Sequence, residues 1–185
     1  VVANKADSLG SPSVDNRQVE GSLWIKEQVL QIMDDLRRMS MNLRPSILDN
    51  FGLVSGIRWL VNNGGNPSGC CFQVDVRGDE REMSDLAEVT VFRVAQEATS
   101  NIVRHSRAQN GTVTLTFGED HLTLDVQDNG VGFHPPDRVG LYLKENKLGL
   151  LGMQQRVQSV GGMVQIESSI GEGTRIHVTI PYHVS

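Results

Sequence analysis

The chain carries the stretch Asp128-Asn129-Gly130-Val131-Gly132-Phe133 one residue after the segment 122–126, whose composition predicts a β-strand. An acidic residue, a residue that tolerates tight turns and two glycines, spaced D-x-G-x-G, therefore follow the end of a strand. Such a segment can place a carboxylate in the wall of a pocket and bring bare backbone close to a ligand. An ordinary turn has the same composition, so a functional interpretation requires matching features elsewhere in the chain.

Size and composition are those of a soluble globular protein. The chain has 185 residues, enough for one sizeable core and an appendage. Its net charge is −5, so bulk electrostatics does not favour nucleic acid as a partner. The sequence contains neither a signal peptide nor a run of about 18 apolar residues suited to a membrane span. The adjacent Cys70 and Cys71 lack metal-ligand spacing and indicate reduced thiols, which fits the cytoplasm.

The remaining elements predict the fold class. Residues 7–22 indicate a linker, and residues 23–44 have apolar positions at steps of three and four, typical of a long amphipathic helix. Further helices are expected at 53–62, 83–105 and 149–160, and strands at 71–77, 111–117, 121–127, 163–168 and 174–181. This order predicts an α+β fold: a two-layer α/β sandwich whose mixed sheet has helices on one face, preceded by a long helix.

The predicted helix at 83–105 carries four polar residues at positions i, i+4, i+7 and i+8, namely Glu97, Asn101, Arg104 and His105. In a regular α-helix these residues share one face. Their carboxylate, amide oxygen, guanidinium and imidazole groups can together hold a divalent metal, orient water and contact phosphate oxygens. An ordinary solvated helix face remains the alternative interpretation.

Two glycine-rich segments follow in the last third of the chain. Gly149-Leu150-Leu151-Gly152-Met153 opens a predicted helix, and glycines at a helix N-terminus allow backbone N–H groups to approach an anion. Gly171-Glu172-Gly173-Thr174 precedes the last predicted strand. Tight packing explains the first segment equally well, and a plain hairpin turn explains the second.

The order of these motifs resembles the ATP-binding domain of the GHKL superfamily, which has the Bergerat ATPase fold. The segments EATSNIVRHSRA at 97–108, DNGVGF at 128–133, GLLGMQQRV at 149–157 and GEGTRIHVTIP at 171–181 more closely resemble bacterial sensor histidine kinases of the NarL-partner type. MSMNLRPSILDNFGL at 39–53 resembles the end of that family's dimerisation helix and its connection to the ATPase domain. The similarity extends over about residues 23–182.

The resemblance implies a division of the chain into three parts. Residues 1–22 would be a linker or the tail of a truncated first dimerisation helix. Residues 23–52 would be the second dimerisation helix and its connection, and residues 53–185 the ATP-binding catalytic domain. The implied reaction is transfer of the γ-phosphate of ATP to a histidine.

The resemblance also implies ATP and Mg²⁺ as cofactors and assigns roles to single residues. Asp128 would accept a hydrogen bond from the adenine amino group, with Thr174 beside it. Asn101 would bind Mg²⁺ through its side-chain oxygen, and Glu97 would position water or assist proton transfer as the catalytic residue. Residues 133–148 would form a lid over ATP.

The other residues implied to contact the nucleotide are glycines, cations and one leucine. Gly130 and Gly132 would allow the nucleotide to pass close to the main chain. Gly149 and Gly152 would present backbone donors to the phosphates. Arg104, His105 and Leu150 would also lie near the nucleotide, without a specified contact.

The sequence departs from the family pattern in two places. The family's acceptor histidine lies on a helix before residues 23–44, whereas the histidines of this chain are His105, His121, His134, His177 and His183. We therefore expect a truncated chain that lacks its phosphoacceptor. Lys147 stands where relatives often have glycine, which puts the details of lid closure in doubt.

The expected partners follow from the same resemblance: a response regulator with a NarL-type output domain, and a second copy in the full-length homodimer. This region is expected in the cytoplasm, and the sequence leaves membrane anchoring of the full-length protein open. Two alternatives stand beside the histidine kinase. An anti-sigma-type GHKL serine kinase is disfavoured by the predicted helix at 23–44, and a degenerate nucleotide-binding or dimerisation module is disfavoured by intact Glu97, Asn101 and Asp128.

Overall fold

A computed structural model of the chain describes residues 45–63, 69–135 and 148–182. The predicted linker at 1–22, the predicted helix at 23–44 and most of the predicted lid, including Lys147, lie outside these ranges. Within them, no helix is long and apolar enough to cross a membrane.

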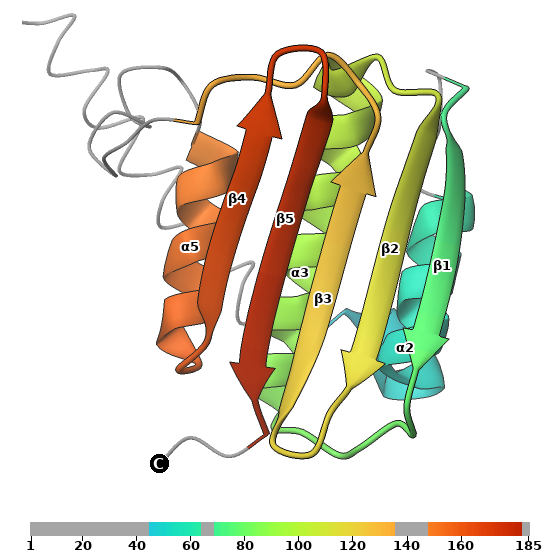
Figure 1. The fold of residues 1–185 in the computed structure, drawn as a ribbon. Helices are drawn as coiled ribbons and strands as arrows, with labels where there is room; N and C mark the ends of the chain where they lie inside the picture. The colour runs from blue at the N-terminus through green and yellow to red at the C-terminus, as the bar shows by residue number, and fades with distance from the viewer. Residues whose placement is uncertain (1–44, 64–68, 136–147, 183–185) are drawn as a thin grey trace, which may run out of the picture. The chain divides into compact units, whose positions relative to one another are not determined.

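The described region is a five-stranded mixed sheet with helices on one face (Figure 1). The strands are β1 (Cys71–Arg77), β2 (Asn110–Phe117), β3 (His121–Asp128), β4 (Met163–Ser169) and β5 (Gly173–Pro181), in the order β1-β2-β3-β5-β4. β1 pairs with β2 in parallel and all other pairs are antiparallel. The helices that cover the sheet are α2 (Ser46–Asn63), α3 (Asp85–Asn101) and α5 (Leu148–Ser159). The predicted two-layer sandwich is therefore confirmed.

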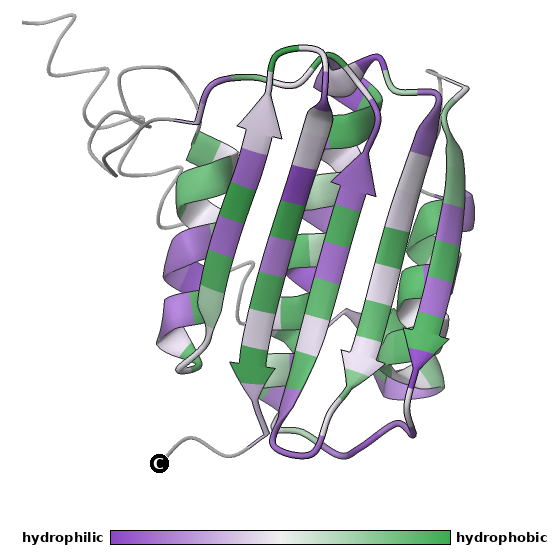
Figure 2. Cartoon of the chain, viewed as in Figure 1, coloured by the Kyte–Doolittle hydropathy of each residue, from purple (hydrophilic) through white to green (hydrophobic). Residues whose placement is uncertain are grey.

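The core lies between the sheet and the helices. Apolar and polar residues alternate along the strands, as Figure 2 shows. Because successive strand side chains point to opposite faces, this alternation sends one set to the helices and leaves the other on an open, polar face. The buried strand residues include Val113, Leu115, Leu122, Leu124 and Val126. Opposite them, α3 buries Val91, Val94, Ala95 and Ala98.

Helix α2 is longer than predicted because it continues across a kink. The sequence predicts a helix only at 53–62, whereas α2 begins at Ser46. The two parts meet at Gly52, whose backbone has φ 71° and ψ 178°, a conformation that glycine adopts readily. Leu48 and Leu53, on either side of the kink, are buried in the same core. The proposed boundary between residues 52 and 53 coincides with this kink and stays a prediction.

Helix α3 begins as predicted but ends differently. The Ser84 hydroxyl accepts a hydrogen bond from the Ala87 N–H at 3.3 Å, which confirms Ser84 as the N-cap. The regular α-helix ends at Asn101, and residues Ile102–Ser106 form a π-turn, η1, which is wider than an α-helical turn. The predicted helix over 83–105 is therefore helical to its end, but its last turn is a π-helix rather than an α-helix. Arg104 and His105 do not keep the α-helical spacing that was expected to align them with Glu97.

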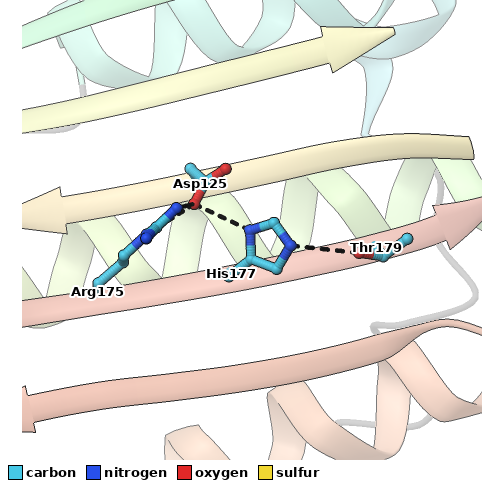
Figure 3. Close-up of polar contacts among 4 residues, drawn as sticks. All are labelled: Asp125, Arg175, His177 and Thr179. Atoms are coloured by element: carbon cyan, nitrogen blue, oxygen red, sulfur yellow. Dashed lines mark hydrogen bonds and ion pairs between the residues drawn. The ribbon is translucent and has the colours of Figure 1, made fainter. Parts of the chain in front are cut away.

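Asp125 organises a polar cluster on the open face of the sheet (Figure 3). Its Oδ1 atom accepts hydrogen bonds from Arg175 Nε at 3.0 Å and Nη2 at 2.7 Å, and lies 3.0 Å from His177 Nδ1. Partial burial alone would raise the pKa of Asp125, but the hydrogen bonds and charges of His177 and Arg175 outweigh it and lower the pKa. This cluster explains the predicted surface position of His177.

We expect Asp125→Asn to destabilise the fold modestly at neutral pH. Because the folded-state pKa of Asp125 is lowered, the carboxylate contributes stability above its unfolded-state pKa and loses it as pH falls through the folded-state value. The Arg175 side chain is 48% exposed and that of Asp125 23%, so solvent screens the pair and the loss of stability should be about 1 kcal/mol or less at pH 7. Urea unfolding should show this difference at pH 7 and little difference near pH 2. Asp75→Asn, an acid on the same face bound by the neutral Gln73, is the matched control. If Asp125→Asn lowered the free energy of unfolding more at low pH than at pH 7, the stabilising role of the ionised Asp125 carboxylate would be refuted.

Candidate functional site

A buried carboxylate stands at the end of the central strand β3. Asp128 is the last residue of β3, is 4% exposed, and pairs with Thr174 of β5. Its Oδ1 atom accepts a hydrogen bond of 2.7 Å from the Gly130 N–H. Burial raises the pKa of Asp128, and the backbone hydrogen bonds from Gly130 and Thr174 offset this rise only in part. A carboxylate that is buried and held by a backbone hydrogen bond can accept a hydrogen bond from a ligand, in a site that water reaches poorly.

The glycines of the D-x-G-x-G segment are required by close backbone packing. A Cβ atom at Gly130 would overlap the carbonyl oxygen of Ser106, which already accepts a 2.7 Å hydrogen bond from the Val131 N–H. Gly132 has φ +60°, and a Cβ atom there would overlap the carbonyl oxygen of Ser169. Packing alone therefore explains both glycines, and their predicted approach to a nucleotide stays a prediction.

Two side chains that the sequence analysis did not assign hold this segment in place. Asn129 Oδ1 accepts hydrogen bonds from the backbone N–H groups of Gln109 and Asn110, at 3.1 and 2.9 Å. On the other side, Ser168 Oγ accepts a 2.9 Å hydrogen bond from the Phe133 N–H. A signal for Ser168 was present in the sequence, because it continues the inward-facing series of Val164 and Ile166 with a polar residue.

Glu97 of α3 meets the first turn of α5. A Cβ atom at Gly149 would overlap the Glu97 Oε1 atom, so the carboxylate lies directly against this glycine. A negative charge at a helix N-terminus is stabilised by the helix dipole and the free N–H groups. The structure thus brings together the predicted catalytic carboxylate and one of the predicted phosphate-binding glycines.

The other predicted residues border these two groups. Asn101 is the last residue of α3 and is partly exposed, whereas Arg104 and His105 are exposed on η1. Leu150 is buried in the first turn of α5, with Gly152 after it. η1 adjoins the D-x-G-x-G segment through the hydrogen bond between Ser106 and Val131. The functional role of each of these residues stays a prediction.

The described residues contain no cluster of three or more His, Cys, Asp or Glu side chains that could hold a metal ion. A magnesium ion bound together with a nucleotide does not require such a cluster, because phosphate oxygens and water supply most of its ligands. The partly exposed amide oxygen of Asn101 is a ligand of the type that Mg²⁺ accepts. The residues present therefore fit a metal delivered with a nucleotide.

We expect Gly149→Ala to impair function while leaving stability nearly unchanged. The methyl group would displace the end of a flexible glutamate side chain, and alanine favours a helix more than glycine does. If Glu97 assists proton transfer, phosphoryl transfer should slow at least about tenfold, since such groups contribute about 100-fold or more. Transfer rates and melting temperatures test this. In a Glu97→Gln background the same change should have no further effect on rate; an undiminished effect there would show that Gly149 acts independently of Glu97.

The comparisons with known proteins agree with this fold. A family model described as histidine kinase-, DNA gyrase B-, and HSP90-like ATPase matches residues 87–184. The matched residues span about half of the chain and include most of α3 and all of β3 and α5. The chain therefore belongs to this family of ATPases, and the predicted GHKL ATP-binding fold is confirmed.

Curated relatives of the chain are named as histidine kinases. The chain is 35% identical over 171 residues to the signal transduction histidine-protein kinase/phosphatase UhpB of Salmonella typhimurium, covering 91% of this chain and 33% of the relative. It is 31% identical over 163 residues to the oxygen sensor histidine kinase NreB of Staphylococcus carnosus, covering 88% of this chain and 46% of that protein. The chain thus spans less than half the length of these relatives.

Solved structures support the fold. The histidine kinase AdeS of Acinetobacter baumannii superimposes with a TM-score of 0.59 at 16% identity, covering 96% of this chain and 89% of that chain. Full-length ShkA, solved in complex with AMPPNP, has a TM-score of 0.58 at 19% identity and covers 72% of this chain and 30% of its own. At these identities the similarity concerns the fold alone.

Proposed function

We propose that this chain is the catalytic ATP-binding region of a two-component sensor histidine kinase, which binds ATP with Mg²⁺ and transfers its γ-phosphate to a histidine. The observation that carries the proposal is the buried Asp128 carboxylate, held by Gly130 at the end of β3 in a fold of the ATPase family. Further support comes from the relatives, which are named as a signal transduction histidine-protein kinase/phosphatase and an oxygen sensor histidine kinase, and from the ShkA structure, whose bound AMPPNP is an ATP analogue.

The adenine base would be recognised at the Asp128 corner. The exocyclic amino group of adenine is a hydrogen-bond donor, and a buried carboxylate is a strong acceptor with no competing donor of its own when ionised. The backbone N–H of Gly130 fixes the carboxylate. In this arrangement an oriented hydrogen bond to the Asp128 carboxylate would select the base.

The phosphates would lie between the end of α3 and the start of α5. Asn101 would hold Mg²⁺, which neutralises the charge on the phosphate oxygens, while the first N–H groups of α5 would bind the phosphates themselves. Glu97 would orient the incoming nucleophile or accept its proton. Because Glu97 lies against Gly149, nucleotide binding would place the phosphates beside this carboxylate.

The phosphate acceptor would be a histidine on a dimerisation helix that these 185 residues do not carry, and a response regulator with a NarL-type output domain would receive the phosphate next. The full-length protein would act as a homodimer. These partners rest on the resemblance of the chain to sensor histidine kinases.

A phosphotransfer assay tests this function. The chain is incubated with γ-labelled ATP, Mg²⁺ and a separately expressed dimerisation domain that carries the acceptor histidine. We expect label on the dimerisation domain, lost on mild acid treatment and retained in base, as expected of a phosphorus–nitrogen bond. Acid-stable label on a hydroxyl side chain would favour the serine kinase instead. ATP binding without any transfer would favour a nucleotide-binding module.

A further inference from the structure

We propose that Ser168 is a positioning residue for adenine selection: it fixes the hydroxyl of Thr174 so that the corner beside Asp128 presents hydrogen-bond acceptors to the base. This inference rests on the proposed function. It assigns a role to a strand residue outside the motifs that identify the ATP site.

The register of the sheet places three polar side chains in one row. Thr174 of β5 pairs with Asp128 of β3 on one side and with Ser168 of β4 on the other. The two preceding rows on the same, helix-facing side are apolar: Val126–Ile176–Ile166 and Leu124–Val178–Val164. A polar row that ends an apolar face needs hydrogen-bond partners of its own, because it borders the core.

The hydrogen bonds of Ser168 determine which way its proton points. Its Oγ atom lies 2.8 Å from the carbonyl oxygen of Gly173, which can only accept, so the Ser168 hydroxyl donates there. The same oxygen accepts from the Phe133 N–H at 2.9 Å. It also lies 3.0 Å from Thr174 Oγ1. Since the one proton of Ser168 is already used, the Thr174 hydroxyl is the donor in this third hydrogen bond.

The hydrogen bond that Thr174 donates to Ser168 determines what the Thr174 hydroxyl can offer a ligand. Once its proton points to Ser168, Thr174 Oγ1 can only accept further hydrogen bonds. Together with the Asp128 carboxylate, Thr174 Oγ1 gives this corner two acceptors in one row of the sheet. The amino group on C6 of adenine can donate to both of them, whereas guanine carries a carbonyl acceptor on C6, so a base docked with C6 at this corner favours ATP over GTP. Without Ser168 Oγ, the Thr174 hydroxyl can rotate and donate to a carbonyl.

The glycines around the row keep it fixed in place. Gly173, whose carbonyl accepts from Ser168, has φ +82°, and a Cβ atom there would overlap the carbonyl oxygen of Asp128. The Gly171 N–H donates to the Val131 carbonyl at 2.7 Å, which ties the β4–β5 turn to the D-x-G-x-G segment. Ser168 therefore joins β4, β5 and the segment after β3 at one oxygen atom.

Competition binding with a fluorescent ATP analogue tests the proposal on the full 185-residue chain. Ser168→Ala should raise the Kd for ATP·Mg²⁺ about tenfold, the effect of one hydrogen bond, and raise the Kd for GTP·Mg²⁺ less. The preference for ATP over GTP should therefore fall several-fold. Ser169→Ala, the same change at the next residue on the opposite face of β4, should alter neither constant. Ser168→Thr, which keeps the hydroxyl, should restore the preference.

A double-mutant cycle separates positioning from a general structural effect. Thr174→Val should reduce the ATP preference on its own, and adding Ser168→Ala should reduce it no further, because Ser168 acts through Thr174.

The outcomes for the two proposals differ. Unchanged ATP and GTP constants in a folded Ser168→Ala variant, or an undiminished effect in the Thr174→Val background, would overturn the role of Ser168 and leave ATP binding intact. If the unsubstituted chain did not bind ATP, both the proposed function and the role of Ser168 would be contradicted.

Discussion

Asp128→Asn should weaken ATP binding about 100-fold or more while leaving the fold intact. The single side-chain oxygen of asparagine would be taken by the Gly130 N–H, which Asp128 Oδ1 now accepts at 2.7 Å. The new amide N–H₂ would then face the adenine amino group, so two donors would oppose each other. Loss of a charge-assisted hydrogen bond together with an unsatisfied donor corresponds to about 3 kcal/mol. Isothermal titration calorimetry with ATP·Mg²⁺ measures the loss.

The same substitution should not lower stability at neutral pH. Burial raises the folded-state pKa of Asp128 above its unfolded-state value, so the folded protein loses stability as pH rises through that folded-state pKa. Asparagine removes this ionisation, and the variant should melt at the same temperature as the parent or higher at pH 7. Asp125→Asn, an acid in the same strand but on the open face, is the control and should bind ATP normally. Normal ATP affinity in a folded Asp128→Asn variant would refute the adenine role.

Asn101→Ala should reduce Mg²⁺-dependent phosphoryl transfer about 100-fold or more and weaken nucleotide binding much less. A metal ligand stabilises the charge that develops in the transition state by several kcal/mol, whereas most of the ATP-binding contacts lie elsewhere. Single-turnover transfer to the acceptor histidine is measured across Mg²⁺ and ATP concentrations. It gives the rate of phosphoryl transfer and the affinity for the nucleotide. Asn101 occupies the last α-helical position before η1, so the substitution should not disturb the core.

A matched control exists at the end of another helix. Asn63 is the last residue of α2, is exposed, and donates only to the backbone carbonyl of Trp59 in the described structure. Asn63→Ala should leave transfer unchanged. Equal transfer by Asn101→Ala and the parent would contradict the metal assignment, and an equal loss of binding and transfer would assign Asn101 to the nucleotide rather than to the metal.

The sheet could be predicted from the sequence because its two faces have opposite polarity. Alternation along residues 111–117 and 121–127 places Val113, Leu115, Leu122 and Leu124 on one face, and these side chains are buried. The strand bounds accordingly agree to within one residue with those predicted. Ser84 was predictable as an N-cap because capping depends on residues close in sequence.

The helices were harder to predict where tertiary packing decides their limits. Residues 46–51 extend α2 because Leu48 packs back against Gly56, a contact that local periodicity does not reveal. The π-turn after Asn101 has no sequence signal that we identified, and it changes the direction of Arg104 and His105. Leu86, an apolar position in the predicted helix, is 53% exposed.

The location of the candidate site could be predicted from its motifs. The contacts that require a particular residue at each position could not. Glycine at 130 and 132 suggested space for a ligand, whereas the structure shows backbone carbonyl groups of Ser106 and Ser169 in that space. Ser168 and Asn129 were missed because each holds the segment after β3 through a hydrogen bond between residues 20 or more positions apart in the chain. The pairing of β5 with β3 and β4 brings Asp128, Thr174 and Ser168 into one row. The sequence alone does not reveal which strands pair or in which register.

Calorimetric titration of the unsubstituted chain with ATP·Mg²⁺ tests the central claim most directly. Binding of one ATP per chain, with much weaker binding of GTP·Mg²⁺ under the same conditions, is the predicted result. Absence of saturable heat with ATP, or equal affinity for ATP and GTP, would contradict an adenine-selective site at Asp128.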